Sequence, residues 1–225
     1  MNPARKSAFR YAFPGIAGLC AIGLLAACGK PDPAQAPSVA APQTPSPCVL
    51  PRMAPNAEFS QSDDELFAAA LAGDAGAAAL AIERGANVNA AGALKRTALF
   101  AAAFCDRPAM VKLLLEAGGK HDVSDANGMP ALHAAVVVGG AETAKLLIAN
   151  GANVNGKDAA GRTALHVAAA TNQKPMVELL LAGKANTALR DTHGMTAAAL
   201  AADNGHSTLA TAIKQWQLQH KAPQP

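Results

Sequence analysis

A four-residue motif returns at constant spacing between residues 97 and 199 and constrains the fold more than any other feature. Each copy starts 33 residues after the one before: Thr97-Ala98-Leu99-Phe100, Pro130-Ala131-Leu132-His133, Thr163-Ala164-Leu165-His166 and Thr196-Ala197-Ala198-Ala199. Aspartates and glycines recur in the same frame: Asp125, Asp158, Asp191, Gly128, Gly161 and Gly194. Each unit has a short run of small residues and then a longer apolar run, which predicts two helices such as 132–138 and 141–149. One helix pair cannot bury its own apolar faces, so the units have to stack.

The repeating units resemble the ankyrin repeat, in which an Asp-x-x-Gly turn, a Thr-Pro-Leu-His helix start and a closing Gly-Ala-Asn follow one another. Residues 85–89 and 151–155 both read Gly-Ala-Asn-Val-Asn at the closing position. The resemblance covers about residues 61–216 and implies an all-α, ankyrin-repeat solenoid of about five helix-turn-helix units with projecting hairpin fingers. We expect residues 217–225 to form a C-terminal tail.

Three units depart from the pattern, and each departure predicts a local change. The first unit lacks the motif, but residues 62–65 read Ser-Asp-Asp-Glu, which predicts a helix-capping box. In the second unit Gly92 and Lys95 replace the Asp and Gly of the finger, which predicts an irregular turn. In the fourth unit Lys184 takes the position of Gly151, which predicts that the helix end shifts by one residue.

The composition favours closely packed helices and argues against an electrostatic nucleic-acid surface. The chain is 51% hydrophobic but only 4% aromatic, so its core has to be built from many small side chains. The formal net charge is +3, and the three basic residues within 1–27, a segment without acids, account for all of it. The rest of the chain is therefore neutral. Because nucleic acid is bound through clustered Lys and Arg, we expect no nucleic-acid partner.

Residues 1–27 have the layout of a bacterial export signal, with a basic start, an apolar run over 11–27 and small residues at its end. The alternative is a retained membrane-spanning helix, but the apolar run is shorter than the ~20 residues that a bilayer requires. Leu-Ala-Ala-Cys at 25–28 resembles the lipobox of bacterial lipoproteins. The resemblance implies that Cys28 is lipidated and anchors the protein in the bacterial cell envelope. Gly29 stands where Asp favours the inner membrane, which implies the periplasmic face of the outer membrane.

Prolines recur every few residues from 28 to 60 without a helical or alternating apolar period, so we interpret 28–60 as a Pro/Ala-rich tether. Cys48 lies inside this tether, and Cys105 lies in the repeat region. An oxidising compartment favours a disulfide between them, and two unpaired thiols remain the alternative. Neither cysteine belongs to a Cys-x-x-Cys pair, so redox catalysis is not expected.

No arrangement of residues in the sequence indicates catalysis. Residues 151–157 match the phosphate-binding pattern Gly-x-x-x-x-Gly-Lys, but Asp158 follows where a Ser or Thr is needed, and its carboxylate repels phosphate. His133 and His166 occupy one repeat position, where ankyrin repeats use the side chain to hold neighbouring backbone. The sequence has neither a His-Glu-x-x-His motif nor paired Cys-x-x-Cys motifs. We therefore expect no enzyme activity, no cofactor and no metal site.

Function is expected on a surface of the solenoid. In ankyrin proteins the two residues after the Ala-Ala of each unit point into a concave face that binds partners. The resemblance carries this role to Leu71, Phe104, Val137, Val138, Thr171 and Asp203, and it gives rim contacts to the finger residues Arg162 and His193. The apolar members predict a patch that a partner protein covers, with Phe104 as its main anchor. Coverage by the tether, or a shifted register that makes these side chains core, is the alternative.

Two functions follow from this interpretation. The first is a monomeric, lipid-anchored protein that binds a partner protein in the envelope, either as an accessory factor or as an inhibitor such as an immunity protein. The second is a structural spacer of the envelope without a tight partner. A charged residue at position 104 distinguishes them, because it abolishes the first function and leaves the second unchanged.

Overall fold

The computed structural model describes Cys48 and residues 60–220. Across this described part the chain forms ten α-helices and one 3-10 helix, and it contains isolated β-bridges but no longer strand: α1 (Gln61–Ala72), α2 (Ala75–Glu83), η1 (Ala93–Lys95), α3 (Ala98–Phe104), α4 (Pro108–Glu116), α5 (Ala131–Val138), α6 (Ala141–Ala149), α7 (Ala164–Ala170), α8 (Lys174–Ala182), α9 (Ala197–Asp203) and α10 (Ser207–Gln219). The predicted signal 1–27, the lipidation site Cys28 and nearly all of the tether lie outside the described residues.

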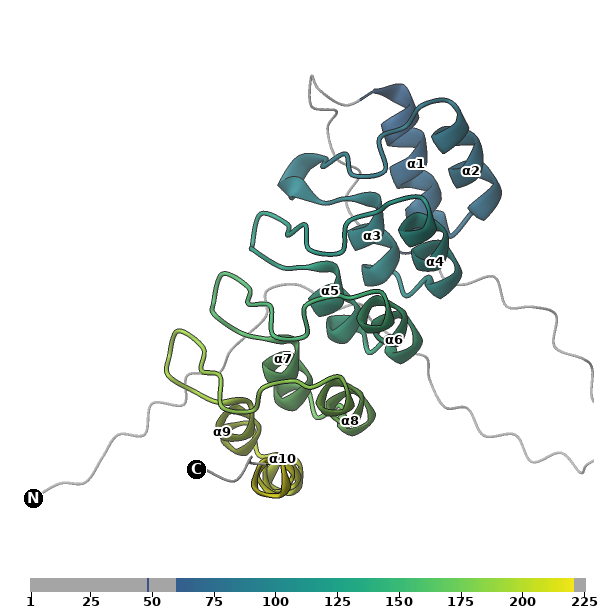
Figure 1. Ribbon diagram of the computed structural model, residues 1–225. Helices are drawn as coiled ribbons and strands as arrows, with labels where there is room; N and C mark the ends of the chain where they lie inside the picture. The colour runs from purple at the N-terminus through teal and green to yellow at the C-terminus, as the bar shows by residue number, and fades with distance from the viewer. Residues whose placement is uncertain (1–47, 49–59, 221–225) are drawn as a thin grey trace, which may run out of the picture. The chain divides into compact units, whose positions relative to one another are not determined.

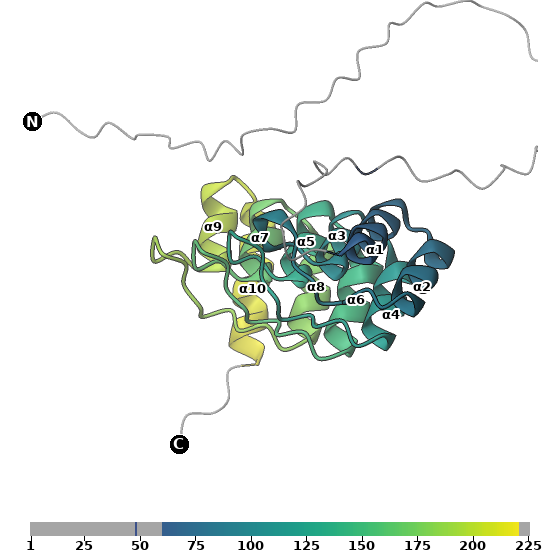
Figure 2. The same ribbon diagram turned by 90° about the horizontal axis from the view of Figure 1, so that it is seen from above.

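The helices pair along the chain into five units that stack one on the next. Each unit consists of an odd-numbered helix and the even-numbered helix that follows it. The odd-numbered helices pack side by side in one layer, and the even-numbered helices form a second layer (Figures 1 and 2). The loops between units project beyond the odd-numbered layer as fingers (Figure 1). The predicted all-α solenoid of five helix-turn-helix units is therefore confirmed, although α10 continues to Gln219, into the segment predicted as tail.

The core of the repeat domain is built mainly from alanine and leucine. Six of the seven residues of α3 are buried: Ala98, Leu99, Phe100, Ala101, Ala102 and Ala103. The longer helices bury only one stripe each, such as Met110, Val111 and Leu114 in α4. Because alanine is small, successive odd-numbered helices approach closely and still fill the space between them. Phe100 is the largest fully buried side chain among the described residues.

Threonine side chains cap the N-terminal ends of the short helices α3 and α9. Thr97 Oγ1 accepts a hydrogen bond from the N–H of Phe100 at 3.2 Å, and Thr196 Oγ1 accepts one from the N–H of Ala199 at 3.2 Å. These bonds satisfy amide groups that the first turn of a helix leaves without a partner. The threonine of the repeated motif is therefore a helix cap.

The capping box of α1 lies two residues before the predicted one. Ser60 Oγ accepts the N–H of Asp63 at 3.2 Å, and the Asp63 carboxylate accepts the N–H of Ser60 at 2.9 Å. The prediction of a box at 62–65 was wrong, because Asp63 also accepts the N–H of Asn87 at 2.6 Å and this distant contact selects the register. Burial raises the pKa of the Asp63 carboxyl, but the hydrogen bonds from Ser60 and Asn87 outweigh it and hold the pKa below its ordinary value.

The other two local predictions had different outcomes. The finger of the second unit is irregular as predicted, with Leu94 and Lys95 both at φ 55° in η1. The predicted shift at Lys184 was wrong, since α8 ends in register with α6 and Lys184 itself adopts φ 67°. A non-glycine residue in this left-handed region costs about 1–2 kcal/mol. The N–H of Asn186, two residues further on, donates to Asn155 Oδ1 at 2.7 Å, and this bond to the preceding repeat helps to hold the turn against that cost.

Aspartate side chains hold the last three fingers. Asp125 Oδ1 accepts the N–H of Asn127 at 2.8 Å and the N–H of Met129 at 3.0 Å, and Asp158 and Asp191 make the equivalent two bonds. One backbone hydrogen bond then joins each finger to the next: Ala126 N–H to Leu94 C=O at 2.7 Å, Ala159 N–H to Asn127 C=O at 2.9 Å, and Thr192 N–H to Ala160 C=O at 3.0 Å. The repeated Asp-x-x-Gly is thus the signature of a finger whose tip bonds to its neighbour.

Replacing Gly161 by Ala is expected to destabilise the protein more than replacing Gly194 by Ala. Both glycines have positive φ, 71° and 75°, so both changes introduce a strain of about 1–2 kcal/mol. A Cβ at position 161 also lies 3.0 Å from the backbone N of Thr192, whereas nothing lies within 4 Å of a Cβ at 194. Urea unfolding of the two variants measures the difference. Equal losses would show that the close approach of neighbouring fingers contributes nothing to stability.

Candidate functional site

The side chains predicted to bind a partner lie at the C-terminal ends of the short helices. Leu71, Phe104 and Val137 are half-buried and pack against the core, whereas Val138 is 41% exposed. Thr171 and Asp203 are exposed. Because α1, α3, α5, α7 and α9 stack side by side, these helix ends follow one another along the solenoid. We call these six residues the helix-end row.

The helix-end row changes character along the solenoid. It is apolar in the first three units and polar in the last two. Thr171 Oγ1 donates to the C=O of Val167 at 2.8 Å and accepts from Gln173 Nε2 at 2.9 Å, so its hydroxyl is already satisfied within the protein. A partner that matches the whole row therefore presents apolar groups to the first three units and polar groups to the last two.

Phe104 is the best-supported anchor of the row. Its ring stacks on that of Phe100, with centroids 6.3 Å apart and planes 11° from parallel. Phe100 is buried in the core, and the guanidinium of Arg96 lies 5.3 Å from its ring centroid. The Phe104 ring is thus held by a rigid neighbour while part of the residue stays accessible. An aromatic side chain with this little freedom loses little entropy when a partner covers it.

The two predicted finger residues have different surroundings. Arg162 donates to the Asp158 carboxylate through Nε at 2.9 Å and pairs with it through Nη2 at 2.8 Å, and only 29% of its side chain is exposed. The positive charge of Arg162 is therefore paired with the Asp158 carboxylate of the same finger. His193 is exposed, with Nδ1 3.8 Å from Asp191 Oδ2. Of the two, His193 is the residue that a partner can reach more readily.

Sequence reasoning missed Leu94 and the polar bonds that join the helix ends. Leu94, in the finger of the second unit, is 49% exposed. The irregular turn predicted there was the one sequence feature that could have drawn attention to it. Thr143 Oγ1 donates to Asp106 Oδ1 at 2.7 Å, and Gln173 Nε2 donates to the C=O of Val136 at 2.9 Å. Each bond crosses between neighbouring units beside the row. These residues belong to no repeated motif, so the sequence carried no signal for them.

A disulfide joins Cys48 to Cys105 next to the helix-end row. The two Cα atoms are 5.5 Å apart, and both residues are half-buried. Cys105 directly follows Phe104 at the end of α3. The sequence left pairing and two free thiols open, and the structure contains the pair. The bond places Cys48 beside the apolar half of the row.

The two histidines of the repeated motif are structural. His133 and His166 are buried, and each ring places Nε2 on a backbone oxygen of the following unit: the C=O of Arg162 at 2.9 Å and that of Met195 at 3.0 Å, respectively. His166 Nδ1 also lies 3.2 Å from the N–H of Thr163, which donates to it. Burial lowers the pKa of both histidines below the ordinary value of 6.5, although the backbone hydrogen bonds raise it. The proposed role of holding neighbouring backbone is confirmed.

These lowered pKa values predict that stability falls as the pH drops below about 6.5. The folded protein holds both rings neutral, so below that pH the unfolded chain binds more protons than the folded one. Stability is fully present above the unfolded-state pKa and is lost as the pH falls toward the lowered folded-state pKa, by at most about 1.4 kcal/mol per pH unit for each histidine. Urea unfolding across this range measures the loss. Replacing His133 and His166 together by Asn should flatten the profile, and a flat wild-type profile would contradict the prediction.

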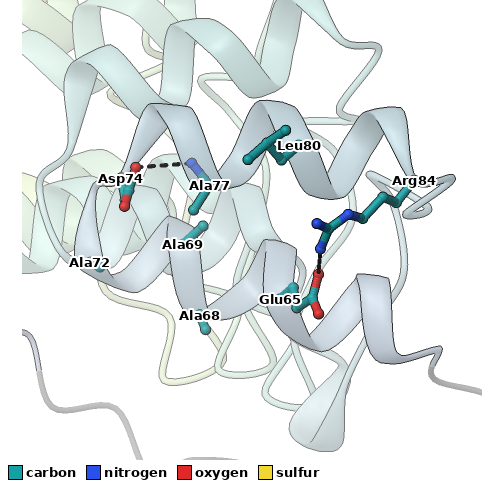
Figure 3. A pocket seen from close by; sticks show the side chains of 8 residues that line it. All are labelled: Glu65, Ala68, Ala69, Ala72, Asp74, Ala77, Leu80 and Arg84. Carbon is teal, nitrogen blue, oxygen red and sulfur yellow. Dashed lines mark hydrogen bonds and ion pairs between the residues drawn. The ribbon is translucent and has the colours of Figure 1, made fainter.

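One groove lies at the exposed face of the first unit, between α1 and α2 (Figure 3). Its volume is about 420 Å³, and its lining includes Ala68, Ala72 and Ala77 together with Leu80, which is 52% exposed. An ion pair of 3.1 Å between Arg84 and Glu65 closes one end. The lining contains neither a nucleophile nor a histidine.

Within the described ranges, no group of three or more His, Cys, Asp or Glu residues is placed to hold a metal, and no helix is long and apolar enough to cross a membrane.

Comparison with known proteins identifies the family. The family model described as ankyrin repeats (3 copies) matches residues 66–158 and 141–216, well over half of the chain. The chain therefore belongs to the ankyrin-repeat family. A search of curated proteins found no match. Ankyrin repeats act in protein–protein interaction and are typically modules without enzymatic activity, which agrees with a function carried on a surface.

Proposed function

We propose that this protein is a lipid-anchored component of the bacterial cell envelope whose ankyrin repeats bind a partner protein through the concave face. The helix-end row supplies the contacts on that face, and Phe104 is the central anchor. The partner is held, assisted or inhibited by this binding, as by an accessory factor or an immunity protein. The protein acts as a monomer that carries its binding surface at the end of a tether.

The observation that carries the proposal is the apolar half of the helix-end row. Leu71, Phe104, Val137 and Val138 come from the neighbouring helices α1, α3 and α5, and none of them is fully buried. Full burial of such a side chain from full exposure contributes about 1.5–3 kcal/mol, and a partner that covers the part still exposed gains a fraction of this at each residue. Packing against the core accounts for the buried part of Leu71, Phe104 and Val137, whereas the exposed part of the row, with Val138 at 41%, is the surface that a partner can cover. Binding by the row is therefore favoured over a purely structural role.

The export signal and Cys28 support the anchoring part of the proposal. The sequence around Cys28 is similar to the lipobox, and Gly29 after it favours the periplasmic face of the outer membrane. Lipid chains contribute about 0.8 kcal/mol per buried methylene, so two or more chains hold a protein firmly. Replacing Cys28 by Ser should move the protein from the membrane fraction to the soluble fraction. Retention in the membrane fraction would exclude anchoring through Cys28.

The binding part is tested by capture from a native envelope extract with the tagged full chain as bait. Parallel baits carry Phe104→Asp or Val138→Asp, and Leu80→Asp serves as the matched control. Leu80 is an exposed leucine on the groove of the first unit, away from the helix-end row. A partner is expected to be retained by the wild type and by Leu80→Asp and lost by the two row variants. Far-UV circular dichroism of each bait shows that the fold is intact.

The second candidate function is a structural spacer, and the same experiment decides between the two. A spacer predicts that all four baits retain the same proteins or that none is enriched. Because Val138 is more exposed than Phe104, its replacement disturbs the core less, and it keeps the test valid if Phe104→Asp fails to fold. Equal capture by the wild type and Val138→Asp would remove the support for the binding row.

A further inference from the structure

The first unit exposes two side chains at positions that the other four units bury. Gly73 lies 33 residues before Asp106, and both have positive φ at the end of their short helix, so the repeat frame extends into the first unit. Within this frame Ala68 of α1 and Ala77 of α2 are exposed. The residues at the position of Ala68 in the later units are at most 7% exposed: Ala101, Ala134, Val167 and Leu200. Those at the position of Ala77 are at most 4% exposed: Met110, Thr143, Met176 and Leu209.

A preceding unit is what buries these two positions. In the described chain the last unit has a neighbour on its preceding side only, and its Leu200 and Leu209 are buried. The first unit has a neighbour on its following side only, and its Ala68 and Ala77 are exposed. The exposed side of the first unit is therefore the side on which, in every later unit, the preceding unit stacks.

The groove between α1 and α2 lies on this same side (Figure 3). Its lining includes both of the exposed alanines, and Leu80 beside them is 52% exposed. The charged residues of the lining stand at the two ends of the groove, with Asp74 at one end and the Glu65–Arg84 ion pair at the other. We call this surface of α1 and α2, with the groove, the first-unit face. It is the apolar stacking surface of a repeat without the unit that covers it elsewhere in the molecule.

The opposite end of the solenoid carries a charge at the matching place. Ile148 of the third unit lies against Gly183 of the fourth, and its Cγ2 atom is 3.3 Å from the position of a Cβ on that glycine. This position therefore faces the following unit, and the first four units hold an aliphatic residue there: Ile82, Leu115, Ile148 and Leu181. The last unit holds Lys214, which is exposed. A second copy that continued the stack would bring this ammonium group onto the apolar groove, at the cost of its hydration.

We propose that the first-unit face is a docking site for a helix pair of another protein, which stacks on α1 and α2 as each preceding unit stacks within the solenoid. The same interface exists four times in this molecule, and the groove continues it by one step. Because alanine contributes little bulk, the helix pair fills the groove with larger aliphatic or aromatic side chains. Its polar groups meet Asp74 and the Glu65–Arg84 pair at the two ends. The site is separate from the helix-end row, and the inference does not depend on the proposed function.

The test is photocrosslinking in cells that express the full chain with the photoreactive residue p-benzoylphenylalanine in place of Leu80. The same residue in place of Leu218, which is 74% exposed in α10 of the last unit, is the matched control. Mass spectrometry identifies the crosslinked peptide. The expected product at position 80, absent at position 218, is a peptide of another protein whose apolar residues recur at helical spacing. A crosslink to a second copy, to residues 49–59 of the same chain or to nothing would overturn the proposal.

Two further changes locate the contact. Ala68→Glu, added to the chain with the photoreactive residue at 80, should abolish the crosslink, because it places a charge in the groove. Val138→Asp in the helix-end row should leave the crosslink unchanged. Far-UV circular dichroism of each variant shows whether the helices are retained. A crosslink that persists with Ala68→Glu would contradict docking in the groove.

The capture experiment separates this inference from the proposed function. A protein that docks on the first-unit face is expected to be lost by the Leu80→Asp bait and retained by the Val138→Asp bait. A protein that binds the helix-end row shows the reverse pattern. If the row binds no partner, the crosslink at position 80 still forms. If the first-unit face binds no partner, the crosslink fails while the capture by the row is unaffected.

Discussion

Replacing Phe100 by Ala is expected to lower the free energy of unfolding by about 3–5 kcal/mol. Phe100 is 1% exposed and is the largest fully buried side chain among the described residues. The small alanines around it cannot expand to fill the space that the ring leaves, so a cavity remains. The replacement also removes the ring on which Phe104 stacks and the ring that Arg96 covers. Urea unfolding followed by circular dichroism measures the loss.

Phe104→Ala is the matched control for this prediction. The residue type, the helix and the substitution are the same, but Phe104 is only half-buried. Its loss of stability is expected to be clearly smaller, while its loss of partner capture is expected to be larger. Equal destabilisation by the two changes would place Phe104 in the core and remove it from the binding surface. The pair therefore separates packing from binding within one helix.

Loss of the Cys48–Cys105 disulfide is expected to lower the free energy of unfolding by roughly 4 kcal/mol in the chain-entropy model, given the 57-residue separation of the two cysteines. The bond closes a loop that contains the whole first unit and α3. Without it the unfolded chain gains freedom, whereas the helix contacts of the folded state remain. Stability in repeat proteins is close to a sum of unit and interface terms, so the last three units are expected to keep theirs. Urea unfolding with and without a reductant measures the effect.

The double variant Cys48→Ser/Cys105→Ser is the control for the reductant. Its unfolding midpoint is expected to lie at that of the reduced wild type and to be unaffected by dithiothreitol. If the oxidised and reduced wild type unfold at the same urea concentration, the bond does not restrict the unfolded chain. A reductant effect of the same size in the double variant would assign the change to the reagent and not to the disulfide.

The predictions that were wrong, in the first and fourth units, both concern the end of a helix. A Ser-x-x-acidic pattern exists in two registers near the start of α1, and the hydrogen bond from Asn87 to Asp63 selects one of them. A lysine is unfavourable at φ 67°, yet Lys184 adopts that value in a turn where the N–H of Asn186 donates to Asn155 Oδ1 at 2.7 Å. In both cases a contact distant in the sequence accompanies a departure from the local pattern, and at Lys184 the left-handed backbone costs about 1–2 kcal/mol.

The amino-acid sequence by itself determined the repeat, its frame and nearly every helix of this protein. Each unit of 33 residues makes the same contacts with its neighbours, so the residues that make them recur at the same position of every unit. It also indicated which helix ends carry the candidate binding surface. Only the tertiary structure showed that Arg162 is paired within its finger and that Cys48 is bonded beside Phe104. The second of these contacts lies outside the repeat, and the first depends on the path of one finger. Neither has a periodic signature, so both were decided by the distances that folding sets between side chains.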